Sequence, residues 1–285
     1  MLMDSRELRS FLILVKRELW ESRNLFIASP LVLAGLLTVG LVWALLQVPS
    51  DLLSETATQL GSSLEGLPAT NLAPFFMPVA IPFVMVLFVC SLIYLINALY
   101  QDRKDSSILF WQSMPVSNMK TVLSKVFVVC FMAPLFVAGA IALLVIVAML
   151  TLSLLGVSYG ITIVGFGAML LAGIYSVLLV YLTAVLAALW LFPTVGWVLL
   201  FSAYARGLPF LWAIGSFILL LFLEDLVFGT QFLGNWVESR SNNYNYIIFQ
   251  ISDFFNRLFS YDMLFGIALG ALLITGSVYM RRYTD

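Results

Sequence analysis

The residues best suited to chemistry lie in one polar stretch, "DRKDSSILFWQSMPVSNMK" (102–120), between two long apolar segments. Its first four residues are all charged, in a chain that has only 14 basic and 15 acidic residues. The segment Ile108–Trp111 that follows is aliphatic and aromatic. A basic loop is what the positive-inside rule predicts on the cytoplasmic side of any membrane protein, but that rule does not explain an apolar tip. Such a tip is typical of a surface that docks another protein; the alternative is a turn that re-enters the lipid headgroups.

Catalytic chemistry is not indicated elsewhere in the sequence. The chain has no histidine, the commonest metal ligand and general base. It has no Ser/Lys or paired-carboxylate arrangement at a plausible spacing, and no Gly-x-x-x-x-Gly-Lys-Ser/Thr loop that would cradle a phosphate. Cys90 and Cys130 lie in apolar runs and are expected to be packing residues. We therefore expect no enzyme and no cofactor in this chain, and the net charge of −1 gives no reason to expect a nucleic-acid partner.

The composition is that of an integral membrane protein in contact with a lipid bilayer. Hydrophobic residues make up 62% of the 285 residues and charged residues 10%, whereas a soluble domain carries roughly a quarter charged residues. The apolar runs are continuous rather than alternating, so we expect helices and not a barrel. The sequence predicts an all-α protein, a single transmembrane domain over 1–285, with six spans at about 25–47, 73–100, 122–152, 172–204, 208–228 and 263–280. Residues 48–72, which are polar and rich in Ser, Thr and Gly, are expected to form a loop.

The region 161–204 is too long for one crossing of the bilayer as a straight helix. Two spans would fit only with almost no connection between them, around Pro193. We favour one long helix, about Ala172–Tyr204, kinked near Pro193 and preceded by an apolar re-entrant or surface segment. A seven-span chain is the alternative.

An amphipathic helix is predicted ahead of the first span, over about 4–23. Its apolar stripe includes Leu8, Val15 and Leu19, against a polar side that carries Lys16, Arg17 and Glu18. Such a helix lies flat on the membrane surface. With six spans and the N-terminus inside, every basic residue except Arg240 and Arg257 faces the cytoplasm. The chain is therefore expected in the cell (inner) membrane as a multi-pass protein with both termini cytoplasmic.

Several residues are candidates for an outer gate. Pro74, Pro78 and Pro82 recur every four residues in the second span; this predicts either a weakened, gate-like outer half or merely a kinked helix. Glu224 and Asp225, near the outer end of the fifth span, belong either to the headgroup zone or to a gate or cation-attracting vestibule. The remaining gate candidate is Trp236. It lies in the aromatic stretch 229–262, whose composition is typical of a membrane interface.

The polar stretch resembles the corresponding loop in permease subunits of type-two ATP-binding-cassette exporters. Those subunits carry, after their second span, an acidic residue, a short helix, a Pro-Val/Ile-Ser turn and a lysine. The matching residues here are Asp102, Ser106-Ser107-Ile108, Met114-Pro115-Val116-Ser117 and Lys125. Ser106 stands where the family usually has glycine. The resemblance extends to Lys16-Arg17-Glu18-Leu19-Trp20, to the six-span plan and to Ser202-Ala203-Tyr204-Ala205-Arg206.

The resemblance implies a cytoplasmic coupling helix that sits in a cleft of a separate ATPase subunit, with the surface helix as a second contact. The implied coupling residues are Asp102, Ser106, Ser107, Ile108, Leu109, Phe110, Trp111, Pro115, Lys16 and Arg17. It also implies short outer-face helices between spans 5 and 6, a second permease (the same chain or a homologue), and ATP with Mg bound by the ATPase. The expected function is export of an amphipathic peptide, lipid or drug-like molecule. The alternative, an ion-coupled secondary transporter, predicts acidic groups within the spans and usually an internal repeat. No ionisable group lies near the middle of the first four predicted spans, and the sequence shows no internal repeat.

Overall fold

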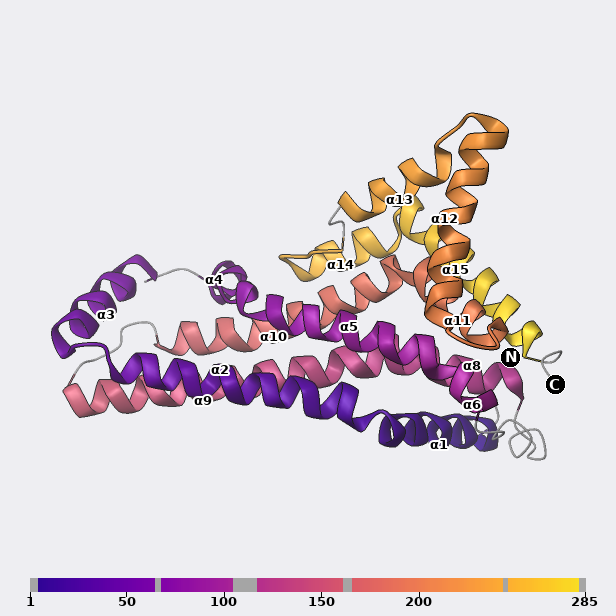
Figure 1. The fold of residues 1–285 in the computed structure, drawn as a ribbon. Coiled ribbons are helices and arrows are strands. Elements are labelled where there is room, and N and C mark those ends of the chain that lie inside the picture. The colour runs from indigo at the N-terminus through magenta and orange to yellow at the C-terminus, as the bar shows by residue number, and fades with distance from the viewer. Residues whose placement is uncertain (1–4, 65–67, 105–116, 161–165, 243–245, 282–285) are drawn as a thin grey trace.

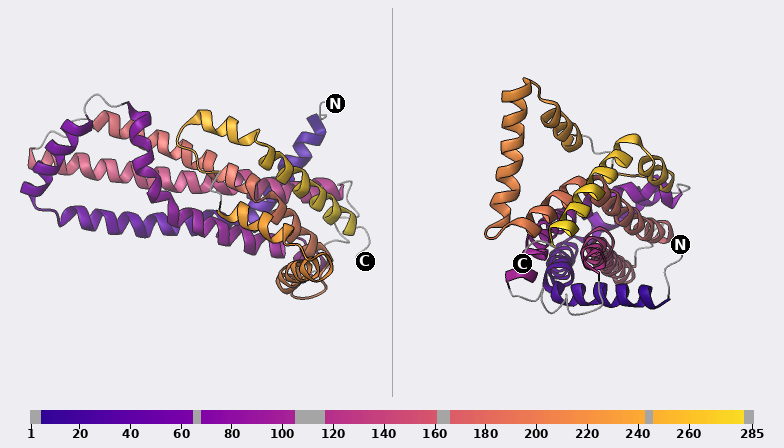
Figure 2. Two further views of the ribbon diagram at one scale, coloured as in Figure 1. Left: turned by 90° about the horizontal axis from the view of Figure 1, so that it is seen from above. Right: turned by 90° about the vertical axis from the view of Figure 1, so that its right-hand side faces the viewer.

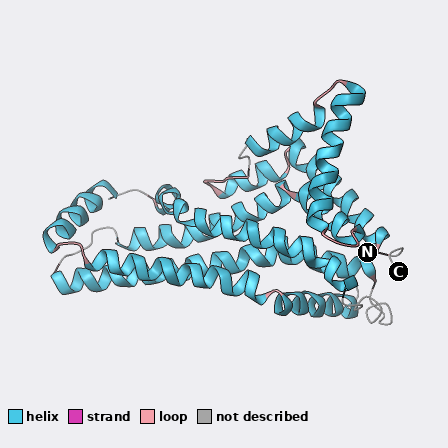
Figure 3. Cartoon of the chain, in the orientation of Figure 1, coloured by secondary structure: helices cyan, strands magenta, loops and turns pink. Residues whose placement is uncertain are grey.

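The computed structural model describes residues 5–64, 68–104, 117–160, 166–242 and 246–281, and this part of the chain is helical without a strand (Figure 3). Six helices in it are long and apolar enough to cross a membrane, which confirms the predicted all-α, six-span fold class. They are Asn24–Leu46, Met77–Lys104, Asn118–Tyr159, Phe166–Trp190, Pro209–Phe228 and Tyr261–Met280.

Four long helices run alongside one another as a bundle (Figure 1): α2 (Ser29–Leu46), α5 (Ile81–Ala98), α9 (Ala133–Tyr159) and α10 (Phe166–Trp190). Each is apolar on all sides, as a helix must be when it contacts neighbouring helices on one face and lipid on the other. The core between them includes Ala34, Phe83, Ile141 and Val180.

The third span is the longest continuous helix. It starts with α8 (Asn118–Phe127), passes through a π-helical turn, η3 (Val128–Met132), and continues as α9 to Gly160, whose left-handed φ of 65° ends it. At about 1.5 Å per residue, this helix is roughly twice as long as the hydrocarbon core is thick. Part of it therefore projects beyond the bilayer.

The N-terminal helix α1 (Ser5–Glu21) lies across the end of the bundle, as the right-hand view of Figure 2 shows. A π-helical turn, η1 (Asn24–Ala28), leads from it into α2. Leu14 and Val15 are buried, and the Phe11 ring packs edge-on against Phe127 of α8 at 5.8 Å. Leu8 and Leu12 are exposed, so α1 has one apolar face against the bundle and another free for headgroups. The predicted helix before the first span is confirmed, and its place on the membrane surface stays a prediction.

One region differs from the predicted loop, and the second span is interrupted at its prolines. Residues 48–72 are largely helical, because α3 (Ser50–Leu64) and the start of α4 (Ala69–Phe76) replace the expected loop. The prediction weighted composition, but residues 50–60 contain neither Gly nor Pro and do not break a helix. The second span is divided at its prolines: Pro78 and Pro82 occupy the first turns of the 3₁₀ turn η2 (Met77–Ala80) and of α5. Because α4, η2 and α5 follow one another without a gap, the prolines interrupt the regular α-helical hydrogen bonds of this span, as the predicted kink requires; a gate at this place stays a prediction.

The fourth span consists of two helices. α10 begins at Phe166, before the expected Ala172, so residues 166–171 belong to the helix and not to a surface segment. The helix is interrupted at Leu191. α11 (Phe192–Tyr204) follows with Pro193 in its first turn, which confirms the predicted disruption near that proline. α11 has 13 residues, fewer than the roughly 20 needed to cross a bilayer.

The C-terminal part extends away from the bundle and then returns to it. α12 (Pro209–Phe228) stands across the direction of the bundle and appears end-on in the left view of Figure 2. Two short helices, α13 (Phe232–Asn242) and α14 (Ile251–Leu258), then lead to α15 (Tyr261–Met280), as predicted for the segment between spans 5 and 6. Gly196 of α11 and Gly270 of α15 let these two helices approach closely.

Candidate functional site

Four charged side chains from four distant segments meet at the end of the bundle that α1 covers; we call them the charge cluster. Lys125 Nζ lies 3.0 Å from Glu18 Oε2 and 3.6 Å from Asp102 Oδ2. Arg281 Nη2 lies 3.3 Å from the same Asp102 oxygen. The members are Glu18 of α1, Asp102 of α6 (Tyr100–Lys104), Lys125 of α8 and Arg281 after α15, with exposed fractions of 1%, 8%, 2% and 3%.

The charge cluster holds two acidic and two basic residues, so its formal charge is balanced. Burying an ionised side chain is costly unless it is paired and hydrogen-bonded. Glu18 Oε2 also accepts a hydrogen bond from the Tyr94 hydroxyl at 2.8 Å. Burial lowers the pKa of the Arg281 guanidinium and the Asp102 carboxylate opposes this, but an arginine stays protonated at any physiological pH. Removing one member would leave an uncompensated buried charge, which typically costs about 3–5 kcal/mol.

The charge cluster fixes both flanks of the polar loop. Asp102 lies just before residues 105–116, and Lys125 lies in α8, the helix that follows them. Glu18 links α1 to this pair, and Arg281 links the end of α15. A second link, Lys120 Nζ to Glu7 Oε1 at 3.3 Å, joins α8 to α1 on the exposed side. Exposed pairs of this kind are worth only about 0–1 kcal/mol. The buried contacts therefore hold this end of the bundle together.

The junction of α5 and α6 is held by the end of α11. Ser202 Oγ accepts hydrogen bonds from the Leu99 and Tyr100 amides, both at 3.1 Å, and donates to the Ile96 carbonyl at 2.7 Å. Arg103 Nη2 donates to the carbonyls of Ser202 at 2.8 Å and Ala205 at 2.7 Å. The helix break before Asp102 is therefore anchored to the segment 202–206 that the family resemblance singled out.

Of the predicted coupling residues, the structure places three. Asp102 is in the charge cluster, Lys16 is exposed on α1, and Arg17 Nε donates to Glu21 Oε1 at 2.6 Å. The others fall outside the described residues: Ser106, Ser107, Ile108, Leu109, Phe110, Trp111 and Pro115.

The sequence interpretation missed Glu18 as a cluster member, because it assigned Glu18 to the polar side of α1. Glu18 follows Leu14 by four residues and Val15 by three, and both are buried. Residues at these spacings share one face of a helix. An acidic residue on the buried face was the signal that could have found the cluster.

The outer-gate candidates lie in two separate places. Glu224 accepts hydrogen bonds from the amides of Phe232 at 2.5 Å and Leu233 at 3.0 Å, so it caps α13. Asp225 is exposed beside it. Pro78 lies instead with the bundle, where it lines a cavity, and Pro82 is in the first turn of α5.

Trp236 belongs to a group around Arg240 that joins α13, α10 and α15. The Arg240 guanidinium stacks over the rings of Trp190 at 4.1 Å and Trp236 at 5.0 Å. It donates to the carbonyls of Trp190 at 2.6 Å and Asp262 at 3.0 Å, and the Trp190 indole donates back to the Arg240 carbonyl at 3.0 Å. The carbonyl of Trp190 is one that the break at Leu191 leaves without a regular helical partner. Arg240 thus provides the hydrogen bond that the Trp190 carbonyl lacks at the helix break. The sequence did not predict this structural role.

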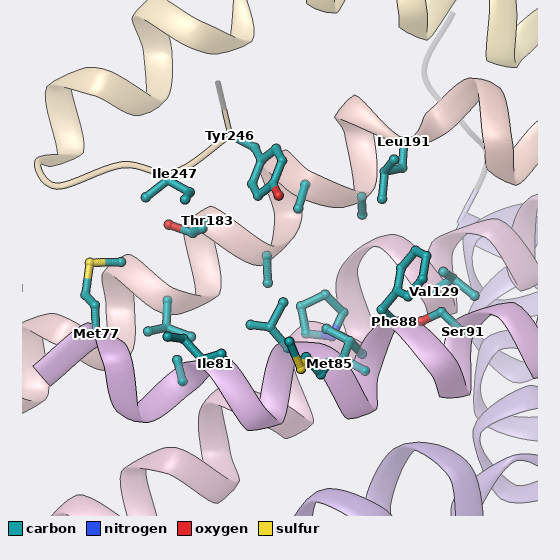
Figure 4. A pocket seen from close by; sticks show the side chains of 18 of the residues that line it. Met77, Ile81, Met85, Phe88, Ser91, Val129, Thr183, Leu191, Tyr246 and Ile247 are labelled. Atoms are coloured by element: carbon teal, nitrogen blue, oxygen red, sulfur yellow. The ribbon is translucent and has the colours of Figure 1, made fainter. Parts of the chain in front are cut away.

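An apolar cavity of about 670 Å³ lies between α5, the α10–α11 pair and the segment 246–249 (Figure 4). Met77, Ile81 and Met85 form one wall, and Thr183, Leu191 and Tyr246 lie on the other. Val129 of η3 also lines the cavity. The size is within the roughly 300–1,000 Å³ of small-molecule sites.

No protein-family model, no curated protein and no solved structure matches this chain.

Proposed function

We propose that the chain is the membrane-spanning permease subunit of an ATP-driven exporter, energised by a separate ATP-binding-cassette ATPase. The observation that carries this proposal is the charge cluster, because it ties α1 and both flanks of the polar loop to three spans. A chain without its own phosphate-binding loop needs a rigid surface through which a partner can apply force. The fold supports the coarser statement by itself: this is a multi-pass helical membrane protein.

In this proposal the end of the bundle with the charge cluster faces the cytoplasm. All of α1, both flanks of the polar loop and the end of α15 lie there, and nine of the 14 basic residues of the chain belong to these described segments. Such an asymmetry is the one the positive-inside rule describes.

The charge cluster suggests how a docked ATPase would act on the spans. A displacement of residues 105–116 would pull on Asp102 and on Lys125. The helix that holds Asp102 follows α5, and the helix that holds Lys125 leads into η3 and α9. Because separating the buried pairs is costly, we expect the helices to move with the loop rather than apart from it. Val129 and much of one face of α5 line the cavity, so such a movement would change the shape of the cavity. This is the alternating access that export requires, with a second permease copy or homologue completing the path.

The second candidate is an ion-coupled secondary transporter, and the observation that favours it is the burial of Glu18 and Asp102. Buried acidic groups in a membrane protein often mark an ion path. Both carboxylates contact Lys125, however, so a basic side chain matches their charge.

The test is capture of the tagged full-length chain from membranes of its own host, followed by identification of co-purifying ATPases. We expect an ATP-binding-cassette ATPase to co-purify with wild type and with Lys104→Ala, and to be lost with Phe110→Ala/Trp111→Ala, because truncated aromatic anchors typically cost about 2 kcal/mol or more each. Retention of the ATPase by the double variant would contradict a docking role for the loop. Transport that stops with an ionophore but continues with ATP depleted would favour the second candidate.

A further inference from the structure

The cavity described above is elongated. Along α5 its lining residues recur at intervals of three or four, from Ile81 through Phe88 to Leu95. They therefore form one face of α5 over about 14 residues, or roughly 21 Å. This is about two thirds of the thickness of the hydrocarbon core. A trough of this length along the membrane normal suits a chain better than a compact molecule.

Among the residues that the structure describes, no charged side chain lines the cavity. Its polar members, among otherwise aliphatic, aromatic, proline and methionine residues, are Ser91, Thr183, Thr194 and Tyr246. A charged or strongly polar ligand would lose its hydration there without compensation. The embedded part of any ligand is therefore apolar and uncharged.

Thr183 provides a specific point of attachment. Its hydroxyl oxygen is buried and has no hydrogen-bond partner in the part of the chain that the structure describes. Figure 4 shows it on the cavity wall near Ile247, towards the end that Met77 lines. A buried hydroxyl without a partner is unfavourable, and a ligand carbonyl or hydroxyl placed beside it would restore the missing bond.

Small side chains keep the cavity open along α10. Ala184, Ala187 and Ala188 line it consecutively after Thr183, opposite the longer side chains of α5. A larger residue at one of these positions would occupy the trough itself.

We propose that the cavity binds one long acyl chain, with the carbonyl at the head of that chain accepting a hydrogen bond from Thr183 and its methylenes lying along α5 towards Leu95. The exported molecule would then be a lipid with an uncharged ester carbonyl, or a fatty acid that binds with its carboxyl group protonated, because the lining offers no counter-charge. This substrate class rests on the proposed function, whereas binding can be tested without the ATPase.

The experiment uses the purified full-length chain in nanodiscs and two probes that share one labelled chain. The first probe is palmitic acid with a diazirine at mid-chain, and the second is a phosphatidylcholine that carries the same chain. After photolysis, the cross-linked residues are mapped by mass spectrometry, with unlabelled palmitate as competitor. We expect saturable labelling of the facing walls, at residues such as Met85 and Ala187. The probe that labels at lower concentration identifies the source of the chain.

Two variants and a matched control make the test specific. Ala187→Phe should abolish the saturable labelling, whereas Leu178→Phe, on the exposed side of the same helix, should leave it unchanged. Thr183→Val should weaken labelling about fivefold, the effect of one lost hydrogen bond. It should also raise the melting temperature of the empty protein, because it removes the unpartnered hydroxyl.

Labelling that does not saturate, or that Ala187→Phe leaves intact, would overturn the proposal, since annular lipid would explain it. Saturable binding without any associated ATPase would keep the acyl-chain site and refute the exporter. An associated ATPase without saturable labelling would support the exporter and refute the acyl-chain site.

Discussion

The Lys125 ammonium and the Glu18 carboxylate lie 3.0 Å apart, although 107 positions separate them in the sequence, and their side chains are 3% and 2% exposed. This ion pair fastens a helix that lies across the bundle to the helix that becomes the third span. A parallel pair, Lys120 with Glu7, joins the same two helices in an exposed position. The chain thus contains its own control for the effect of burial on an ion pair.

The first prediction concerns this ion pair. Glu18→Gln and Lys125→Met should each lower the free energy of unfolding by about 3 kcal/mol, because each leaves one charge of the buried cluster uncompensated. The double variant should be less destabilised than the sum, with a coupling of about 1–3 kcal/mol. Thermal unfolding in detergent measures all three. Glu7→Gln and Lys120→Met, the exposed control, should each change stability by about 1 kcal/mol or less. Equal effects at the two pairs would show that burial does not matter here.

The second prediction concerns the close approach of α11 and α15. A Cβ added to Gly270 would lie 2.6 Å from the carbonyl oxygen of Phe192, so backbone must move. Gly270→Ala should therefore destabilise the protein by about 1–3 kcal/mol. Gly139→Ala, where no atom lies within 4 Å, should be neutral or slightly stabilising because alanine favours the helix. A neutral Gly270→Ala in the same unfolding assay would mean that the two helices are not packed this closely.

The third prediction concerns Arg240, whose burial lowers its pKa without removing its charge at neutral pH. Arg240→Lys keeps the charge but cannot donate in two directions while stacking between Trp190 and Trp236. It should cost about 2 kcal/mol, the value of hydrogen bonds from a charged group, and increase proteolysis between α13 and α14. Trp190→Phe loses the indole hydrogen bond and also leaves a void at a side chain that is 2% exposed, so it should cost more than the about 1 kcal/mol of that bond alone. If Arg240→Lys is as stable as wild type, the guanidinium is not what holds α13 to the broken span.

The fourth prediction concerns orientation. The native Cys90 and Cys130 are buried, so a single introduced cysteine can be followed with an impermeant thiol reagent. In intact cells, Ser54→Cys on α3 should react from outside, whereas Ser113→Cys in the polar loop should react only after the membrane is opened. The reverse pattern would invert the proposed topology and place the loop away from any cytoplasmic ATPase.

The sequence by itself determined the membrane-spanning helices, because a backbone in lipid must satisfy its hydrogen bonds within each segment. Apolar length is therefore a local property, and six spans, the helix before them and the break near Pro193 could be predicted from it. The composition of residues 48–72 misled, since their polarity marks exposure to solvent and not the absence of a helix. The tertiary structure alone decided which charges meet. Glu18, Asp102, Lys125 and Arg281 lie on separate segments, and nothing local to any of them specifies a partner. Likewise, Arg240 appeared only as a basic residue on the outer side, because the carbonyl it satisfies exists only where a distant helix breaks. Ion pairs and caps between distant segments depend on packing, and packing is what only the tertiary structure reveals.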